Sequence, residues 1–504
     1  MKQSSAKKAL MILGTSSGSG KSLMATAICR FLQSHGETVL PFKGQNMSNN
    51  AWVDKNNCEM AYSQAVQAWA AKIDPLCCMN PILLKPKGDS ISEVIHLGKS
   101  VGVTKAREYY EDWFAPGWKA IQKGLKELKS IHPQGRLIVE GAGSPVEINL
   151  KHRDLTNLRL AQYINANCLL VADIERGGVF AQLIGTLALL SSSERKLIKG
   201  IIINRFRGDS SLFDTGREWI EKETGIPVLG VMPWLNELFP KEDSLDLIER
   251  AKKKKSAEIN IVAIRLSSIS NFSDLDPLEA ESTINIQWVL PGGLLGKPDA
   301  VIIPGSKETL KDLQELKASG LGDQIKDYAM SGGNVLGICG GLQILGESLE
   351  ETYCGENLQA GKSSLKLEGL NLLPIKTIFK PKKSLINREV LALWPAKCQV
   401  EGFEIHHGIS HLNNVKSNET KPFAEDPLLG WVISDPESGI ICGTYLHGVF
   451  ENGEWRRHWM NEIRQRKGLP LLGIREVNYR HERDEIINRL ADSFAKNIDL
   501  SPVL

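Results

Sequence analysis

The feature that most constrains the fold is a glycine-rich loop near the N-terminus. The apolar run Ala9–Leu13 predicts a short buried strand, and Leu23–Gln33 predicts a helix. The segment between them, Gly14–Ser22, reads GTSSGSGKS. Glycines let backbone N–H groups turn towards phosphate, and the N-terminus of the following helix adds a favourable dipole. This arrangement predicts a nucleotide site at the edge of a parallel α/β sheet.

Residues of this loop have separate expected roles. Lys21 can reach the β- and γ-phosphates of ATP, and the Ser22 hydroxyl suits Mg²⁺. The spacing departs from the strict phosphate-loop pattern, because five residues instead of four separate Gly14 from Gly20, and Thr15 replaces the first glycine. We expect ATP to be bound by Gly14, Thr15, Gly18, Gly20, Lys21 and Ser22.

A polar segment follows the next predicted strand, Thr38–Phe42. It offers one cation and several amides where a γ-phosphate and an acceptor carboxylate would meet. We therefore expect Lys43, Asn46 and Asn49 to handle the carboxylate and the phosphate.

Two acids close later predicted strands, at the edge where ligands collect in parallel sheets. Glu140 follows Arg136–Val139, and Asp173 follows Cys168–Ala172. Carboxylate oxygens suit Mg²⁺. We expect Ser22, Glu140 and Asp173 to hold the metal, although each acid alone could equally be a helix cap or a surface ion pair.

The second half of the chain carries a cysteine on a glycine-flanked turn. Asn334–Gln343 reads NVLGICGGLQ, the pattern of a strand, a tight turn and a helix. Small neighbours allow a nucleophile to sit on such a strained turn, and the helix N-terminus favours a thiolate. We expect Cys339 to be a nucleophile, with Gly340 and Gly305 supplying N–H groups to an oxyanion hole.

A histidine at the end of another predicted strand is the expected general base. His447 lies in Gly443–Gly448, after the strand Ile440–Tyr445. A cysteine and a histidine far apart in sequence, both at strand ends, are the layout of a thiol nucleophile pair. For a third member, Glu404 is a candidate by composition, and a dyad without a carboxylate is the alternative.

Strand and helix patterns alternate twice, and this predicts an α/β chain with two doubly wound, mostly parallel sheets. The other predicted strands are Gly200–Ile203, Pro227–Val231, Ile259–Leu266 and Ala300–Ile303, with helix between Leu310 and Met330. The expected divisions are a nucleotide domain at residues 1–250, a lysine-rich linker at 251–257, a second domain with Cys339 and His447 at 258–453 and a helical appendage at 454–504.

Composition narrows the class of partners. The formal net charge is +2, from 61 Lys and Arg against 59 Asp and Glu, so no bulk field favours nucleic acid. No run approaches the ~20 apolar residues of a membrane span. Nine cysteines without paired spacing indicate neither a zinc site nor a disulfide framework. We expect a cytoplasmic enzyme without membrane insertion or a tightly bound organic cofactor.

These motifs together resemble known families. The loop is similar to that of dethiobiotin-synthetase-like enzymes, and the Cys339–His447 half resembles class I glutamine amidotransferases, except that Val449 stands where their triad has a glutamate. Both halves in this order resemble the cobyric acid synthase family over nearly the whole chain. The most specific segments are Pro41–Asn50, Met79–Pro86, Glu140–Leu150, Asp173–Phe180, Asn204–Asp209, Gly402–Gly408 and Gly443–Phe450.

The resemblance implies a particular reaction. In that family, four glutamines and four ATP amidate the b, d, e and g carboxylates of adenosylcobyrinic acid a,c-diamide through acyl phosphates. The implied partners are this corrinoid, L-glutamine and Mg·ATP. A related glutamine-dependent enzyme that amidates a carboxylate, such as cobyrinic acid a,c-diamide synthase, is the first alternative. A nucleotide switch protein with an inactive amidotransferase half is the second.

Overall fold

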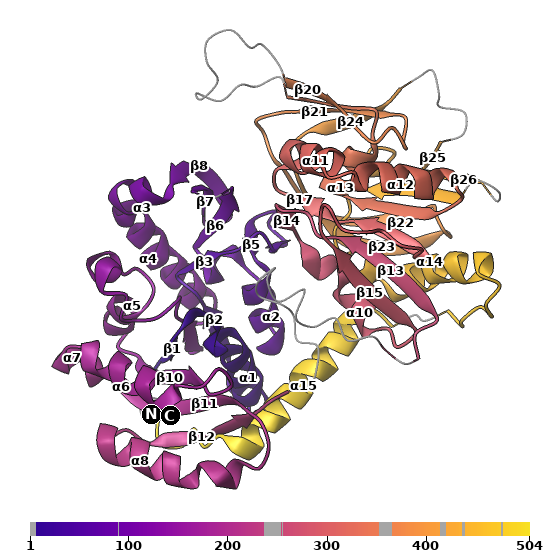
Figure 1. The fold of residues 1–504 in the computed structure, drawn as a ribbon. Coiled ribbons are helices and arrows are strands. Elements are labelled where there is room, and N and C mark those ends of the chain that lie inside the picture. Colours follow the sequence, from indigo (N-terminus) through magenta and orange to yellow (C-terminus); the bar gives the residue numbers. More distant parts are fainter. Residues whose placement is uncertain are drawn as a thin grey trace. The chain divides into compact units, whose positions relative to one another are not determined.

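The computed structural model describes residues 7–88, 90–235, 254, 256–351, 365–413, 420–435, 439–474 and 477–504. The chain divides into two compact units (Figure 1). Unit 1 comprises Met1–Ser48, Asp54–Phe239 and Arg483–Leu504, and unit 2 comprises Asn49–Val53 and Pro240–Glu482. No helix among the described residues is both long enough and apolar enough to cross a bilayer.

Unit 1 is built on a parallel sheet with the strand order β12-β11-β10-β1-β9-β2. Its strands are β1 (Leu10–Gly14), β2 (Val39–Phe42), β9 (Arg136–Glu140), β10 (Asn167–Asp173), β11 (Ile198–Phe206) and β12 (Val228–Pro233). Every strand predicted for the first half is therefore confirmed. The order reverses at β1, and ligands of such sheets bind at the carboxyl ends of the strands near the reversal. The glycine-rich loop leaves the sheet at this point.

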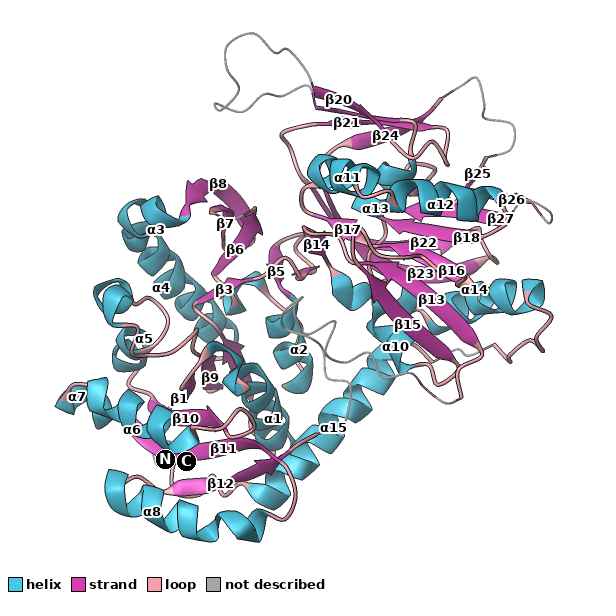
Figure 2. Cartoon of the chain, viewed as in Figure 1, coloured by secondary structure: helices cyan, strands magenta, loops and turns pink. Residues whose placement is uncertain are grey.

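The strands of this sheet are buried on both faces, as near-continuous apolar runs require. Leu10, Met11, Ile12 and Leu13 are fully buried. Helices pack around this sheet and the rest of unit 1 (Figure 2). They are α1 (Lys21–Ser34), α2 (Tyr62–Ala70), α3 (Ala106–Asp112), α4 (Phe114–Ile131), α5 (Leu158–Tyr163), α6 (Val179–Leu189), α7 (Ser192–Arg195) and α8 (Asp214–Thr224). The predicted helix after the loop is confirmed as α1.

A second, smaller sheet in unit 1 has the order β3-β6-β7-β8. It is formed by β3 (Gln45–Met47), β6 (Ile82–Lys87), β7 (Ile91–His96) and β8 (Lys99–Lys105). The strand β5 (Glu59–Ala61) leads directly into α2. Because β3 follows β2 closely, this sheet carries the polar segment predicted after the second strand.

Unit 2 is built on a sheet with the order β15-β13-β16-β18-β27-β26-β25. Its strands are β13 (Ile259–Ile264), β15 (Ile284–Val289), β16 (Ala300–Ile303), β18 (Asn334–Ile338), β25 (Lys421–Pro422), β26 (Gly430–Asp435) and β27 (Gly439–Thr444). Five of them run parallel and β25 and β26 close the edge antiparallel. The predicted mostly parallel sheet is confirmed here as well.

Smaller elements complete unit 2. The helices are α10 (Asp276–Ala280), α11 (Thr309–Ala318), α12 (Leu321–Met330), α13 (Gly340–Leu345) and α14 (Gly453–Arg466). The additional strands are β4 (Ala51–Val53), β14 (Ile269–Ser270), β17 (Gly305–Ser306), β19 (Ser348–Glu351), β20 (Leu365–Glu368), β21 (Ile375–Phe379), β22 (Ser384–Ala392), β23 (Cys398–His406) and β24 (Ile409–Leu412). Of these, β23 reaches the carboxyl end of the main sheet, because Phe403 forms a backbone bridge with His447, which follows β27.

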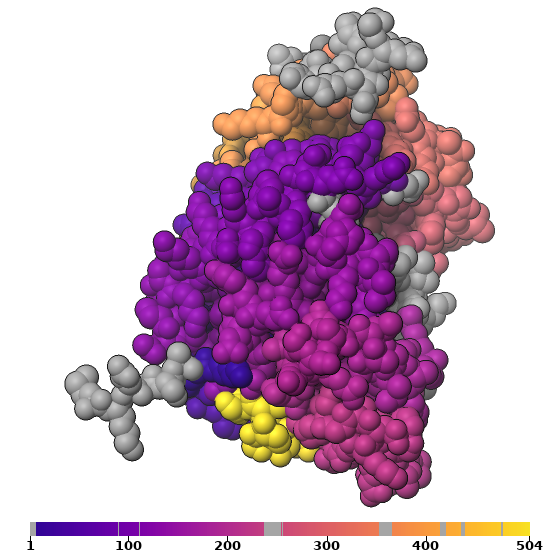
Figure 3. Space-filling model, turned by 90° about the vertical axis from the view of Figure 1, so that its left-hand side faces the viewer, coloured from indigo at the N-terminus to yellow at the C-terminus, as the bar shows by residue number. Residues whose placement is uncertain are grey.

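The segment expected as a C-terminal appendage is divided between the units. Helix α14 packs into the core of unit 2 through Trp455, Trp459 and Met460. The last helix, α15 (Tyr479–Asn497), belongs to unit 1 from Arg483 onward, and the last residues (yellow) lie on its surface (Figure 3). Of the expected linker, residues 251–253 and 255 lie outside the described part, and Lys254 donates to the carbonyl oxygen of Glu281 at 2.8 Å.

Candidate functional site

The glycine-rich loop joins β1 to α1 at the carboxyl edge of the unit 1 sheet. Gly14 ends β1, Thr15 donates its N–H to Val171 O at 3.0 Å, and Gly18 lies in a short 3-10 turn. Gly20 has φ 95°, a left-handed backbone that L side chains rarely adopt, directly before Lys21 opens the helix. The loop is therefore shaped by backbone conformation, as phosphate binding requires.

Two polar side chains at the start of α1 take different directions. Lys21, which is 4% exposed, donates Nζ to the carbonyl oxygens of Ser16 and Ser17 at 2.8 and 3.1 Å. Ser22 donates its hydroxyl to Glu140 Oε1 at 2.6 Å. Two of the three predicted metal-site residues, Ser22 and Glu140, thus lie together.

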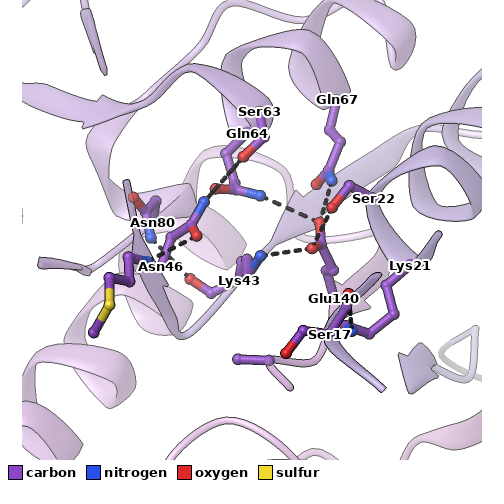
Figure 4. A network of polar contacts seen from close by, with 12 residues as sticks. Ser17, Lys21, Ser22, Lys43, Asn46, Ser63, Gln64, Gln67, Asn80 and Glu140 are labelled. Carbon is purple, nitrogen blue, oxygen red and sulfur yellow. Dashed lines mark hydrogen bonds and ion pairs between the residues drawn. The ribbon is translucent and has the colours of Figure 1, made fainter. Parts of the chain in front are cut away.

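Glu140 is the centre of a buried polar network (Figure 4). It ends β9, it is fully buried, and Lys43 Nζ lies 2.6 Å from Oε1. Two amides of helix α2, from Gln64 and Gln67, donate to Oε2 at 3.3 and 2.5 Å. A buried carboxylate is stable only when it is paired and hydrogen-bonded, and here one cation and three neutral donors meet that condition.

The other residues predicted for this site differ in whether they bond to this network. Asn46 joins it, because its Nδ2 donates to Gln64 Oε1 at 2.8 Å. Asp173 does not, since its Oδ2 pairs with Arg205 Nη1 at 2.8 Å. Asn49 belongs to unit 2, where its carbonyl oxygen accepts the N–H of Asn271 at 3.3 Å. Lys43 and Asn46, but not Asn49, therefore share one site with the loop.

One group of potential metal ligands among the described residues lies away from this network. The ligand atoms of Asp54, Cys58 and Cys77 are within 4.8 Å of one another. The Asp54 carboxylate, however, accepts the backbone N–H groups of Asn56, Cys58 and Cys77 at 2.8 to 3.0 Å. These bonds describe a turn closed by an aspartate, a common structural use of this side chain.

In unit 2, Cys339 lies on a tight turn between β18 and α13. Its backbone has φ 53° and ψ −105°, its N–H donates to Thr444 O at 2.8 Å, and the side chain is 5% exposed. A Cβ on Gly341 would lie 1.9 Å from the carbonyl oxygen of Ile303, so glycine is required there. Strained, non-glycine backbone of this kind clusters at functional sites. The geometry is that of a nucleophile held on an elbow.

His447 follows β27, the neighbour of β18 in the sheet, and is fully buried. Its Nδ1 lies 2.7 Å from Asp274 Oδ2, and the other carboxylate oxygen of Asp274 accepts the N–H of Gly448 at 2.8 Å. The second ring nitrogen, Nε2, is buried without a hydrogen-bond partner among the described residues, and the Cys339 thiol, which is close enough to raise the pKa of His447, donates to Ile405 O at 3.6 Å. This arrangement has the form of a cysteine, histidine and aspartate triad.

The charges around His447 favour its protonated form. Burial lowers the pKa of His447, but the neighbouring Asp274 and Cys339 outweigh burial and raise it to about 10. An imidazole with a raised pKa accepts a thiol proton readily, since the product is an imidazolium between a thiolate and a carboxylate. The site is therefore arranged to hold a proton on His447.

The two expectations for the third member of the triad are both wrong. Glu404 is buried on β23, where it binds His406 Nε2 at 3.0 Å and also contacts Arg388 Nε. Although burial raises the pKa of Glu404, the hydrogen bonds from His406 and Arg388 hold it below its usual range. The carboxylate on His447 is Asp274, so the site is neither Glu404-supported nor a dyad.

The two predicted oxyanion glycines flank the same turn. A Cβ on Gly305 would lie 3.2 Å from His447 Cε1, and one on Gly340 would lie 2.7 Å from Ser306 N. The Gly305 backbone therefore lies against His447, and the Gly340 backbone lies against Ser306, the residue that follows Gly305. Their role in an oxyanion hole stays a prediction.

Three side chains of the two candidate sites were not foreseen. Gln64 and Gln67 lie at positions i and i+3 of α2, and this spacing puts both amides on one buried face. Asp274 lies in a 3-10 turn, Phe272–Leu275, after β13. The paired glutamines were a usable signal, whereas nothing local distinguishes Asp274 from Asp276.

Two family models match the chain. A CobQ/CobB/MinD/ParA nucleotide binding domain covers residues 10–246, and a CobB/CobQ-like glutamine amidotransferase domain covers residues 260–455. Each model lies on one of the two sites described above.

Curated relatives match over the whole length. A protein of Prochlorococcus marinus named cobyric acid synthase is 62% identical over 99% of both chains. A protein of the same name from a Synechococcus species is 60% identical, again over 99% of both chains. A solved glutamine amidotransferase structure covers 41% of this chain at 13% identity and a TM-score of 0.30, a likeness too weak to carry an argument.

Proposed function

The chain belongs to the cobyric acid synthase family, whose members are ATP-dependent, glutamine-hydrolysing ligases, and from this premise we propose its full reaction. It amidates the b, d, e and g side-chain carboxylates of adenosylcobyrinic acid a,c-diamide with ammonia taken from glutamine. The observation that carries the proposal is the 62% identity over 99% of both chains. The triad and the phosphate loop supply a chemical role for each half.

The triad of unit 2 would release the ammonia. His447 takes the Cys339 thiol proton, and the thiolate attacks the glutamine side-chain carbonyl. N–H groups of Gly340 and Gly305 stabilise the oxyanion. His447 returns the proton to the leaving ammonia, and water then hydrolyses the thioester to glutamate. Asp274 Oδ2, which lies 2.7 Å from His447 Nδ1, would hold the Nδ1 proton throughout. Nε2 is then the nitrogen that faces the thiol.

The site of unit 1 would activate the acceptor. A corrinoid carboxylate takes the γ-phosphoryl group of ATP, and ammonia displaces phosphate from the resulting acyl phosphate to leave the amide. Lys21 and the loop N–H groups stabilise the charge on the transferring phosphoryl group. Lys43 and Asn46 lie one hydrogen bond from the same network and would orient the carboxylate. For Asn49, this role is the least supported, because it lies in the other unit.

Magnesium fits this site through oxygen donors. Ser22 would offer its hydroxyl as the ligand with Glu140 in support, and Asp173, whose Oδ2 pairs with Arg205, is the least supported of the three expected residues. Both Glu140 oxygens already accept protein donors, so Glu140 would act by orienting Ser22. When bound, Mg²⁺ neutralises charge on the β- and γ-phosphates. Ammonia must be kept from protonation on its way, so we expect a shielded route between the two reactions.

Mass spectrometry of the corrinoid tests the proposal directly. Adenosylcobyrinic acid a,c-diamide is incubated with the protein, Mg·ATP and glutamine, and each amidation lowers the mass by a fixed increment. We expect a ladder of four steps that disappears in Lys21→Ala and that free ammonia restores in Cys339→Ala. No mass shift while ATP is still hydrolysed would overturn the proposal and favour another carboxylate acceptor, such as cobyrinic acid.

A further inference from the structure

Five residues from the first half of the sequence, Asn49–Val53, belong to unit 2. The residues on either side, Ser48 and Asp54, belong to unit 1. Within the segment, Ala51 and Val53 are fully buried and Asn50 is 2% exposed. Three of the five side chains are buried and the other two, Asn49 and Trp52, are half-buried, so the segment packs as part of unit 2.

On one side, the segment is bonded to the turn that carries Asp274. Ser273 donates its hydroxyl to Asn50 Oδ1 at 2.8 Å, and Asn271 donates Nδ2 to Ala51 O at 2.7 Å, both as buried contacts. Asn271 has φ 51° and caps the 3-10 turn in which Asp274 lies. Two of the three residues immediately before the triad carboxylate are therefore tied to this segment.

On the other side, the segment backs the ring that stacks on His447. Trp52 packs its edge against Phe403 with ring centroids 5.0 Å apart. Phe403 stacks on His447 at 5.3 Å with an interplanar angle of 22°. Their backbones also exchange two hydrogen bonds, of 3.1 and 2.9 Å. The His447 imidazole thus has Asp274 at Nδ1 and Phe403 on its face, and both are supported by one segment.

We propose that Asn49–Val53 is a positioning segment of the glutaminase site, in which Asn50 and Trp52 fix Asp274 and Phe403 and through them orient His447 towards Cys339. The segment touches no reacting atom, so its residues are positioning residues. The proposal rests on the proposed function only in that glutamine hydrolysis is the reaction followed. It also means that residues 258–453 alone lack part of their own active site.

Catalytic rates depend steeply on the positions of the catalytic groups. A displacement of about 1 Å in a catalytic group can lower a rate about 100-fold. A short turn such as Phe272–Leu275 has too few internal hydrogen bonds to hold a charged carboxylate in place, and each anchor removed leaves a buried polar partner unsatisfied. Loss of an anchor should therefore reduce turnover more than it reduces glutamine binding.

The test uses the full-length protein and compares Asn50→Ala with Asn461→Ala. Asn461 is a matched control, because it is a buried asparagine of unit 2 that makes two hydrogen bonds, to Leu472 O and N at 2.8 and 2.9 Å, on α14. Glutamate release from glutamine gives kcat, KM and the pH profile, urea denaturation gives stability, and amidation with free ammonia reports on the other half.

We expect Asn50→Ala to lower the glutaminase kcat about 5- to 100-fold, the range expected for one buried hydrogen bond. The KM for glutamine should change less than about threefold, and amidation with ammonia should stay within about twofold. The histidine limb of the pH profile should move towards a lower pH, as Asp274 loses its alignment. Asn461→Ala should show a similar loss of stability with an unchanged kcat.

A second pair of variants distinguishes the loss of a positioning contact from a general folding defect. Trp52→Ala should lower kcat as Asn50→Ala does, and Trp52→Phe, which keeps a ring against Phe403, should restore most of it. The proposal is overturned if both alanine variants lose only stability, with kcat and pH profile unchanged. A wild-type protein that hydrolyses glutamine but does not amidate the corrinoid would overturn the proposed acceptor alone and leave this proposal testable.

Discussion

Replacement of Asp274 by asparagine removes one charge from the triad with almost no change of shape. In the structure, Asp274 Oδ2 lies 2.7 Å from His447 Nδ1, and Oδ1 accepts the N–H of Gly448 at 2.8 Å. Asparagine has a single side-chain oxygen, which can keep either the bond to Gly448, with the amide nitrogen then facing His447 Nδ1, or the bond to Nδ1, with the bond to Gly448 lost. What is lost is the charge-assisted bond to the imidazole, in a site where histidine is fully buried.

The size of the effect follows from that bond. A hydrogen bond to a charged group contributes about 1.5–3 kcal/mol, and at about 1.4 kcal/mol for each factor of ten its loss lowers kcat about 10- to 150-fold. An asparagine that turned its amide nitrogen towards Nδ1 would select the wrong tautomer, which costs about 10⁴-fold in a serine triad and sets the upper limit. The pKa of His447 should fall from about 10 towards its ordinary value, because Asp274 is one of two groups that raise it.

The assay is steady-state glutamate release from glutamine between pH 6 and pH 10, with ammonia-dependent amidation as the internal check. Glu404→Gln is the matched control, since it neutralises another buried carboxylate of unit 2 that contacts His406 and not His447. We expect Asp274→Asn to lose activity and to shift the pH profile, and Glu404→Gln to keep the profile of the wild type. Full activity in Asp274→Asn, or a shift only in Glu404→Gln, would refute the assignment of the triad.

Three further results are expected. Cys339→Ala should reduce glutamine hydrolysis to background while amidation with ammonia continues. Residual glutaminase activity, measured as glutamate release, would contradict the assignment of Cys339 as the nucleophile. Glu140→Gln should destabilise unit 1 by about 3–5 kcal/mol in urea, because it breaks the buried ion pair between Glu140 and Lys43, and a loss below about 1 kcal/mol would show that the network is not needed. Because the folded protein holds the His447 proton up to a pKa of about 10 and the unfolded chain only to about 6.5, its stabilisation is complete below pH 6.5 and is lost as the pH rises towards 10. The difference in urea midpoint between wild type and Asp274→Asn should therefore shrink over that range, and a growing difference would contradict the sign.

The sequence predicts the local part of both sites. The strand, loop and helix around Lys21 and the turn around Cys339 are written in contiguous residues, so hydrophobic pattern and glycine spacing suffice to find them. Strand ends of a parallel sheet gather at one edge, and this rule also brought Glu140 to Ser22 correctly. It could not predict that Asp173 would turn to Arg205, because a competing partner on a neighbouring strand has no sequence signature.

Two acids show where the same rule reaches its limit. Glu140 is the last residue of β9, so a search at strand ends finds it. Asp274 lies beyond the end of β13, in a turn that points back to His447, and its position depends on contacts with Asn50 and Ala51 from the other half of the sequence. A missing glutamate after the histidine, at Val449, therefore did not mean a missing carboxylate. Where a triad looks incomplete in sequence, the loops after every strand of the sheet are the place to look for its acid, together with whichever distant segment holds that loop in place.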